Sequence, residues 1–110
     1  MESKIRIQLA RRAQIIKALA HPSRLLILDE LFRQRERCVC ELAKLVGADM
    51  STVSRHLTVL RLAGLVAGEK RGLQVFYRLR NSEIGHLVRA TEQMAGGAGD
   101  EAASPALGAF

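Results

Sequence analysis

Two cysteines separated by one residue, Cys38 and Cys40, are the side chains of this 110-residue chain best suited to metal or redox chemistry. They are its only cysteines, and a disulfide between them would close a very small strained ring and connect nothing distant. In a reducing compartment we expect free thiols, available to a soft ion. The nearby Arg35 and Arg37 are expected to favour the thiolate form. The alternative is that both cysteines are small buried hydrophobic residues.

The spacing of the cysteines limits the backbone that can bring both sulfurs to one ion. Residues two apart on a regular helix point about 200° away from each other, whereas in an extended segment they share a face. One ion held by Cys38 and Cys40 therefore demands an extended or distorted backbone where the next helix starts. Movement there would displace the neighbouring elements and so couple them to the ligand.

A second group of side chains has the composition of a DNA-reading helix. Short polar residues and one arginine fill the first turn and a half of a helix expected from residue 50, namely Met50, Ser51, Thr52, Ser54 and Arg55. Short donors and acceptors let a helix approach base edges in the major groove, and the positive helix end favours phosphates. Lys70 and Arg71 lie at an expected hairpin tip, suited to phosphate or minor-groove contact.

Each of these assignments has a structural alternative. The hydroxyl residues are also typical of a solvated helix start, and Lys70 and Arg71 are also typical of a polar turn. His56 lies beside the apolar face of the same helix. A packed or backbone-bonded histidine is the favoured interpretation of His56 over a metal ligand.

The elements that must position these residues are four helices, a hairpin and a final helix. Apolar periodicity and helix-end residues predict helices over about 5–20, from Pro22 to the charged stretch 33–37, over about 40–46 with Gly47 as stop, over 50–63 with Asp49 as cap, and from Asn81 or Ser82 onward. Strands are expected at 65–70 and 73–79, joined by an Arg71-Gly72 turn. The third and fourth helices have the layout of a helix-turn-helix.

Length and composition narrow the function classes. A chain of 110 residues with 48% hydrophobic and 25% charged residues is one ordinary globular domain, which excludes a second large catalytic domain. It has no apolar run long enough for a membrane span and no apolar signal core, so we expect a cytoplasmic protein with no membrane partner. The net charge of +6 is compatible with a polyanionic partner but is weak support for one.

Taken together, four sequence segments resemble the ArsR/SmtB family of metal-responsive repressors. They are His21–Leu25, Cys38–Leu42 continuing through Ser51–Leu57, Ala63–Val66, and Arg71-Gly72 followed by Phe76–Leu79, in an order and spacing that cover about residues 15–80. The resemblance implies a mainly α fold with a small β-hairpin, a winged helix-turn-helix. It also implies a homodimer, formed through the first and last helices, that represses transcription at operator DNA until a toxic metal or metalloid binds. Residues 1–95 would form this DNA-binding and dimerisation domain, and 96–110, rich in Gly and Ala, a flexible C-terminal tail.

Counting donors narrows the inducer that the resemblance implies. A closed structural zinc site wants four protein ligands, and this chain has two cysteines and three scattered histidines. Family members that sense cadmium or lead complete the site with N-terminal cysteines, which residues 1–20 lack, and His86 with Glu83 and Glu92 does not match the spacing of the zinc sensors. Trivalent arsenic or antimony, bound at Cys38 and Cys40, is the inducer that best fits this donor set. DNA binding itself would need no cofactor. Some relatives add a third cysteine where this chain has Ala43, so the third donor is open among water, hydroxide and a cellular thiol.

Two other hypotheses remain. The same repressor could use the cysteines as a redox sensor, or respond to cadmium, lead or zinc. A small thiol reductase is the remote alternative, but such enzymes usually need a Gly-rich phosphate loop or two residues between the cysteines, and neither is present. We therefore expect a regulator and not an enzyme.

Overall fold

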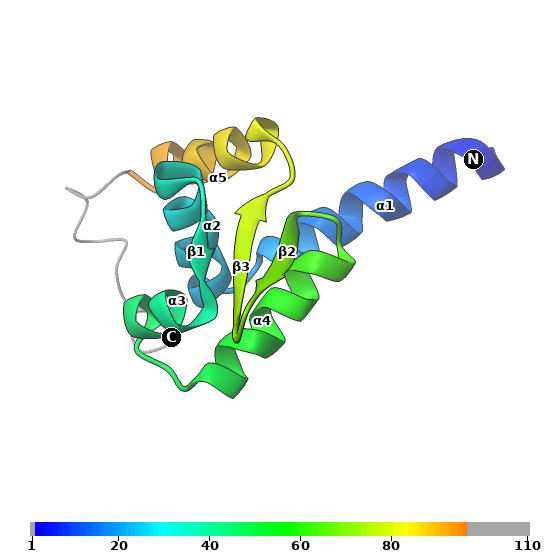
Figure 1. The fold of residues 1–110 in the computed structure, drawn as a ribbon. Helices are drawn as coiled ribbons and strands as arrows, with labels where there is room; N and C mark the ends of the chain where they lie inside the picture. The colour runs from blue at the N-terminus through cyan, green and yellow to red at the C-terminus, as the bar shows by residue number, and fades with distance from the viewer. Residues whose placement is uncertain (1, 97–110) are drawn as a thin grey trace.

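The structure, a computed structural model, describes residues 2–96 and contains five helices and a three-stranded sheet within them (Figure 1). The elements in chain order are α1 Ser3–Leu19, α2 Pro22–Gln34, β1 Arg37–Cys38, α3 Val39–Val46, α4 Met50–Leu62, β2 Val66–Arg71, β3 Gln74–Leu79 and α5 Ser82–Met94. The predicted mainly α fold with a hairpin before the last helix is confirmed. The tail expected at 96–110 lies, apart from Gly96, outside the described residues.

Helix boundaries follow the local chemistry that the sequence indicates. Pro22 occupies the first position of α2, and His21 caps that helix by accepting a hydrogen bond from the Ser23 amide on its Nδ1 at 3.0 Å. Gly47 ends α3 in the left-handed conformation at φ 74°, which glycine adopts without steric cost. Asn81 caps α5 through its side chain. These boundaries are confirmed within one or two residues.

The sheet contains one strand that the sequence analysis did not predict. Its strand order is β1-β3-β2, and the two-residue β1 pairs antiparallel with β3, placing Cys38 opposite Phe76. The hairpin turn is also shifted by one residue from the prediction, because Arg71 pairs with Gln74 as the last rung of the ladder. The two loop residues are therefore Gly72, at φ 63°, and Leu73.

The core lies where α2, α3, α4, α5 and the base of the hairpin meet. Its fully buried apolar side chains include Ile27, Leu28, Leu31, Leu42, Val53, Leu57, Leu60, Val66 and Val88. The expected apolar face of α4 is therefore buried, which leaves the opposite face of that helix open to solvent. Because α3 and α4 pack on the same core, they are held as a fixed helix-turn-helix with the hairpin as its wing.

The first helix packs against the rest of the chain only near its C-terminal end. It projects from the rest of the molecule (Figure 1), and only Ala18 and Leu19 near its C-terminal end are buried. Ile5, Leu9 and Ile16, which follow the helical apolar spacing of this segment, are exposed. Within residues 2–96, no helix has both the length and the hydropathy that a bilayer crossing requires.

Candidate functional site

The two cysteines meet at the junction of β1 and α3. Cys38 is the last residue of β1 and the N-cap of α3, with an extended backbone at φ −80° and ψ 163°, while α3 begins at Val39. The sulfurs of Cys38 and Cys40 lie 2.6 Å apart. The predicted extended backbone is therefore present at Cys38, and it brings the sulfurs together with α3 intact from Val39 onward. No unwinding of α3 is needed for both thiols to reach one ion.

A chain of charged side chains supports this junction. Glu41 accepts a hydrogen bond from the Cys38 amide at 2.9 Å, and the Cys38 sulfur in turn faces the Glu41 amide, which closes a capping box. Arg37 donates to Glu41 at 3.0 Å and to the buried Glu30 at 2.9 Å, and Arg33 also binds Glu30. Burial alone would raise the pKa of Glu30, but the hydrogen bonds from these two arginines lower it overall.

The protonation of Cys38 differs from the expectation. Its side chain is only 4% exposed, and burial raises the pKa of the Cys38 thiol, with the hydrogen bond to Cys40 and the charge of Glu41 acting in the same direction. The Arg37 guanidinium is engaged by Glu30 and Glu41. The prediction that nearby arginines would favour the thiolate of Cys38 is therefore wrong.

A cavity of about 270 Å³ lies between the cysteines, the start of α4 and the wing. It is lined by Cys38, Val39, Cys40, Met50, Ser54, Leu73, Gln74 and Val75. The Gln74 amide nitrogen lies 3.9 Å from the Cys40 sulfur. Sequence reasoning missed the wing residues of this cavity, because the β1–β3 pairing that draws the wing to the cysteines joins segments almost 40 residues apart.

The first turn of α4 is open to solvent and its N-terminus is capped. Asp49 accepts hydrogen bonds from the Thr52 amide at 2.7 Å and from the Ser51 hydroxyl at 3.0 Å. Met50, Ser51, Ser54 and Arg55 are exposed, whereas Thr52 is half-buried. The Arg55 guanidinium lies 3.5 Å from the Thr52 hydroxyl. The predicted reading residues therefore gather on one exposed end of α4.

The wing carries two cationic side chains, and one of them is held in ion pairs within the protein. Lys70 and Arg71 are both exposed near the end of β2. Arg71, however, makes two hydrogen bonds of 2.7 Å to the two carboxylate oxygens of Glu36, also binds Glu69, and stacks over the Phe76 ring at 4.9 Å. These contacts fasten the wing to the turn that precedes β1, so Arg71 has to exchange a carboxylate for a phosphate before it can contact DNA.

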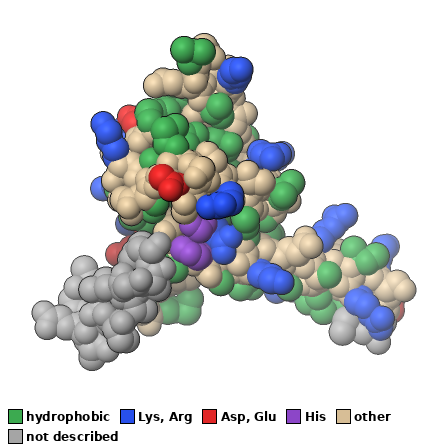
Figure 2. All heavy atoms as spheres, turned by 90° about the horizontal axis from the view of Figure 1, so that it is seen from below, with side chains coloured by type: hydrophobic (Ala, Val, Ile, Leu, Met, Phe, Trp, Pro, Cys, Tyr) green, Lys and Arg blue, Asp and Glu red, His purple; other side chains and the backbone are tan. Residues whose placement is uncertain are grey.

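His56, in the middle of α4, packs against another histidine. Its ring lies 4.4 Å from the His21 ring, measured between centroids. Burial lowers the pKa of His56, and the neighbouring His21, Arg24 and Arg55 lower it further. Figure 2 shows histidine side chains with Lys and Arg side chains beside them on the face seen from below.

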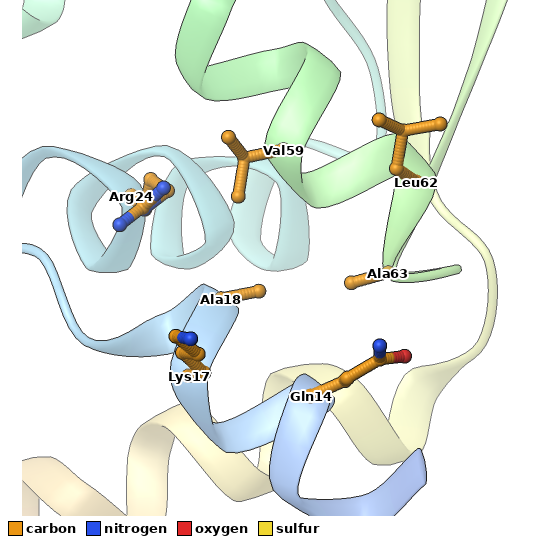
Figure 3. A pocket seen from close by; sticks show the side chains of 7 residues that line it. All are labelled: Gln14, Lys17, Ala18, Arg24, Val59, Leu62 and Ala63. Carbon is orange, nitrogen blue, oxygen red and sulfur yellow. The ribbon is translucent and has the colours of Figure 1, made fainter. Parts of the chain in front are cut away.

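A larger hollow lies away from the sulfurs. It has a volume of about 360 Å³ and lies between α1, α2 and the C-terminal half of α4, as Figure 3 shows. Its lining combines the polar side chains of Gln14, Lys17 and Arg24 with apolar groups and contains no sulfur. Within residues 2–96 there is also no group of three or more His, Cys, Asp or Glu side chains placed to hold a metal ion. The thiol cavity is therefore the better candidate for a soft ligand.

Comparisons with known proteins agree on one family. A sequence profile described as "Bacterial regulatory protein, arsR family" matches residues 21–67, which include α2, α3 and α4. The "HTH-type transcriptional repressor SmtB" of Mycobacterium tuberculosis is 40% identical over 75 residues, covering 68% of this chain and 55% of that protein. The "Cadmium resistance transcriptional regulatory protein CadC" of Listeria innocua is 36% identical over 72 residues, covering 66% and 60%. The chain thus spans little more than half the length of these two relatives.

Two further matches cover most of the length of the related protein. The "Uncharacterized HTH-type transcriptional regulator MJ1325" of Methanocaldococcus jannaschii is 30% identical over 82 residues, which cover 74% of this chain and 92% of that protein. The solved homodimeric winged helix-turn-helix DNA-binding domain of Mb0332 from Mycobacterium bovis is 30% identical with a TM-score of 0.78, covering 91% of this chain and 92% of that domain. The winged helix-turn-helix architecture is confirmed by this match.

Proposed function

Because this chain belongs to the arsR family of bacterial regulatory proteins, we propose that it is a cytoplasmic transcriptional repressor whose hold on operator DNA is released by As(III) or Sb(III) at Cys38 and Cys40. The observation that supports this choice of inducer is the contact of two free thiols, 2.6 Å apart, in a cavity lined in part by α4. Family membership agrees with the expectation of a regulator over a thiol reductase.

The DNA interface of the proposal consists of the exposed start of α4 and the wing. Ser51, Thr52, Ser54 and Arg55 would enter the major groove, with Met50 beside them, while Lys70 and Arg71 contact the backbone or the minor groove. Support comes from the exposure of these side chains, except the half-buried Thr52, and from the burial of the opposite face of α4. Two copies, joined through α1 and α5, would place two reading helices about one helical turn apart on a roughly palindromic site.

The structure supports a route from the thiols to the DNA interface. The sulfurs already meet, so a ligand between them acts by separating them and filling the cavity, and not by unwinding α3. The other walls of that cavity are Met50 and Ser54 of α4 and residues 73–75 of the wing. A bound metalloid therefore changes the spacing between the reading helix and the wing, and both must fit the DNA at once. A coupling of about 1–3 kcal/mol is typical of such linkage.

The test is operator binding titrated with arsenite. Wild type should lose operator affinity by roughly 5- to 150-fold at saturating arsenite, as that coupling implies. The double variant Cys38→Ser and Cys40→Ser should keep its affinity. The control Ser82→Ala, at the exposed first residue of α5, should respond like wild type. Wild-type protein that keeps its DNA at saturating arsenite would refute the inducer but leave the repressor intact.

A second candidate keeps the repressor and makes the thiols a redox sensor. The short distance between the sulfurs favours it. Peroxide would oxidise one thiol to a sulfenic acid, releasing water. The second thiol can condense with it, releasing a second water, only by closing the small strained ring of a Cys38–Cys40 disulfide. Mass spectrometry after mild peroxide distinguishes the two mechanisms: loss of two hydrogens at DNA-releasing doses supports the sensor, and an unmodified protein excludes it.

A further inference from the structure

A third sulfur-containing residue, Met50, lines the cavity beside the two cysteines. We propose that the thioether of Met50 is the third donor at Cys38 and Cys40, and that the completed site takes a soft monovalent ion, Cu(I), with Ag(I) as its analogue. The proposal rests on the two thiol ligands of the proposed function but does not depend on the arsenite response. For As(III) or Sb(III) the third donor is open among water, hydroxide and a cellular thiol, whereas for Cu(I) the chain itself supplies it.

The lining of the cavity selects Met50 by chemistry. Of its eight residues, only Cys38, Cys40 and Met50 carry sulfur. The remaining polar side chains are the Ser54 hydroxyl and the Gln74 amide, which are hard oxygen or weak nitrogen donors. A soft ion that is already bound by two thiolates therefore has one soft group left to recruit.

The position of Met50 gives its thioether the freedom to reach the ion. It is the first residue of α4, and its side chain is 53% exposed, so no core packing fixes it in place. Three rotatable bonds and a polarizable sulfur make methionine adaptable to an irregular gap. The Cys38 backbone and its capping box, in contrast, hold that thiol in a fixed place. The flexible Met50 side chain can therefore complete a site whose two thiols are already close together.

The donor set decides which ion binds. Two thiolates and one thioether form the soft, low-coordinate set that Cu(I) prefers, whereas zinc in proteins seeks four thiolate, imidazole or carboxylate ligands. Binding releases the two thiol protons, so a monovalent ion held by two thiolates and a neutral thioether leaves one net negative charge at the site. Because Met50 immediately precedes Ser51 and Thr52, its capture by the ion draws the first turn of α4 toward the cysteines.

The direct test uses the full wild-type chain labelled with 13C at its methionine methyl groups, under anaerobic conditions, titrated with Ag(I). The chain has three methionines, Met1, Met50 and Met94. One methyl resonance, missing in Met50→Leu, should shift up to one equivalent of Ag(I), in step with the thiolate-to-silver absorbance. The resonance of Met94, which is 78% exposed on α5, is the internal control and should stay in place.

Affinity gives the second readout. In competition with a Cu(I) chelator, Met50→Leu should bind Cu(I) more weakly by about tenfold or more, at least the loss seen when a residue that only orients a ligand is removed. Met94→Leu should match wild type. Three results would each overturn the proposal. The Met50 methyl resonance could stay in place while the thiolates bind Ag(I), the protein could fail to bind Ag(I), or Met50→Leu could bind Cu(I) as tightly as wild type. Release of DNA by arsenite is measured separately on wild type, so the arsenite response and the Met50 donor can each be refuted without the other.

Discussion

At the scale of single residues, the two thiols of the candidate site differ in environment although their sulfurs touch. Cys38 is buried, capped by Glu41 and held in β1, whereas Cys40 lies half-buried in the first turn of α3. Proximity in sequence therefore does not make their reactivity equal. The first thiol is protected as the N-cap of a helix, and the second lines the open cavity next to Gln74.

We predict that iodoacetamide modifies Cys40 before Cys38. Burial blocks access to Cys38 and raises its pKa, so at neutral pH little of it is the reactive thiolate. The Cys38 reaction should accelerate as the pH rises toward that elevated pKa. Peptide mass spectrometry over a pH series measures both rates, with the unfolded protein in denaturant as the control in which the two rates converge. Faster modification of Cys38 in the folded chain would contradict the assignment.

Three cations at the proposed DNA surface should contribute unequally. Arg55→Ala should weaken specific operator binding by roughly 1–3 kcal/mol, while Lys70→Ala should reduce affinity for all sequences and flatten the salt dependence. Arg71→Ala should cost less than Lys70→Ala, because Arg71 must first leave Glu36 and Glu69. Fluorescence anisotropy with operator and scrambled DNA at several salt concentrations checks all three. An Arg55→Ala variant with wild-type operator affinity would remove that residue from the reading surface.

At the scale of elements, what could be predicted from sequence depended on how local the determining interaction is. His21, Pro22 and Gly47 act through backbone groups within four residues, so the helix ends were readable. The strand β1 could not be predicted, because a two-residue strand exists only through its pairing with β3. The Arg71–Glu36 contact joins residues 35 apart and has no local signature. The pair of cysteines could therefore be recognised from sequence as a candidate ligand pair, whereas the cavity that surrounds it could not.

The packing of α5 on α2 gives a prediction at the same scale. Gly85 is buried in α5, and a Cβ at this position would overlap the ring of Phe32. Gly85→Ala should therefore lower the free energy of unfolding by about 1–3 kcal/mol through overpacking, despite the better helix propensity of alanine. Urea denaturation measures the loss. Adding Phe32→Leu, which shortens the opposing side chain, should recover part of it, and a double variant no more stable than Gly85→Ala would argue against this clash.

At the scale of the whole molecule, six of the eleven exposed large apolar residues in the described part of the chain lie on the two helices proposed for dimerisation. Ile5, Ile7, Leu9 and Ile16 on α1, with Leu87 and Met94 on α5, are large apolar side chains left in solvent by a single chain. The helix α1 buries little against its own domain and projects outward (Figure 1), as an element does when a second copy completes its packing. Dimerisation would thus bury the stripe that the sequence periodicity predicts to be apolar.

We predict that Ile16→Asp converts the protein to a monomer at concentrations where wild type is a dimer. Ile16 is 64% exposed in the single chain, and a carboxylate there would have to be desolvated without a partner in an apolar interface. Leu45→Asp is the matched control, because Leu45 is also an exposed apolar residue but lies on α3. Sedimentation velocity across a concentration series measures the mass of each. A monomeric Ile16→Asp variant should also lose operator affinity, since two linked reading helices bind one palindrome far more tightly than one. If instead Ile16→Asp sediments as a dimer like Leu45→Asp, α1 does not carry the interface and the exposed stripe requires another partner.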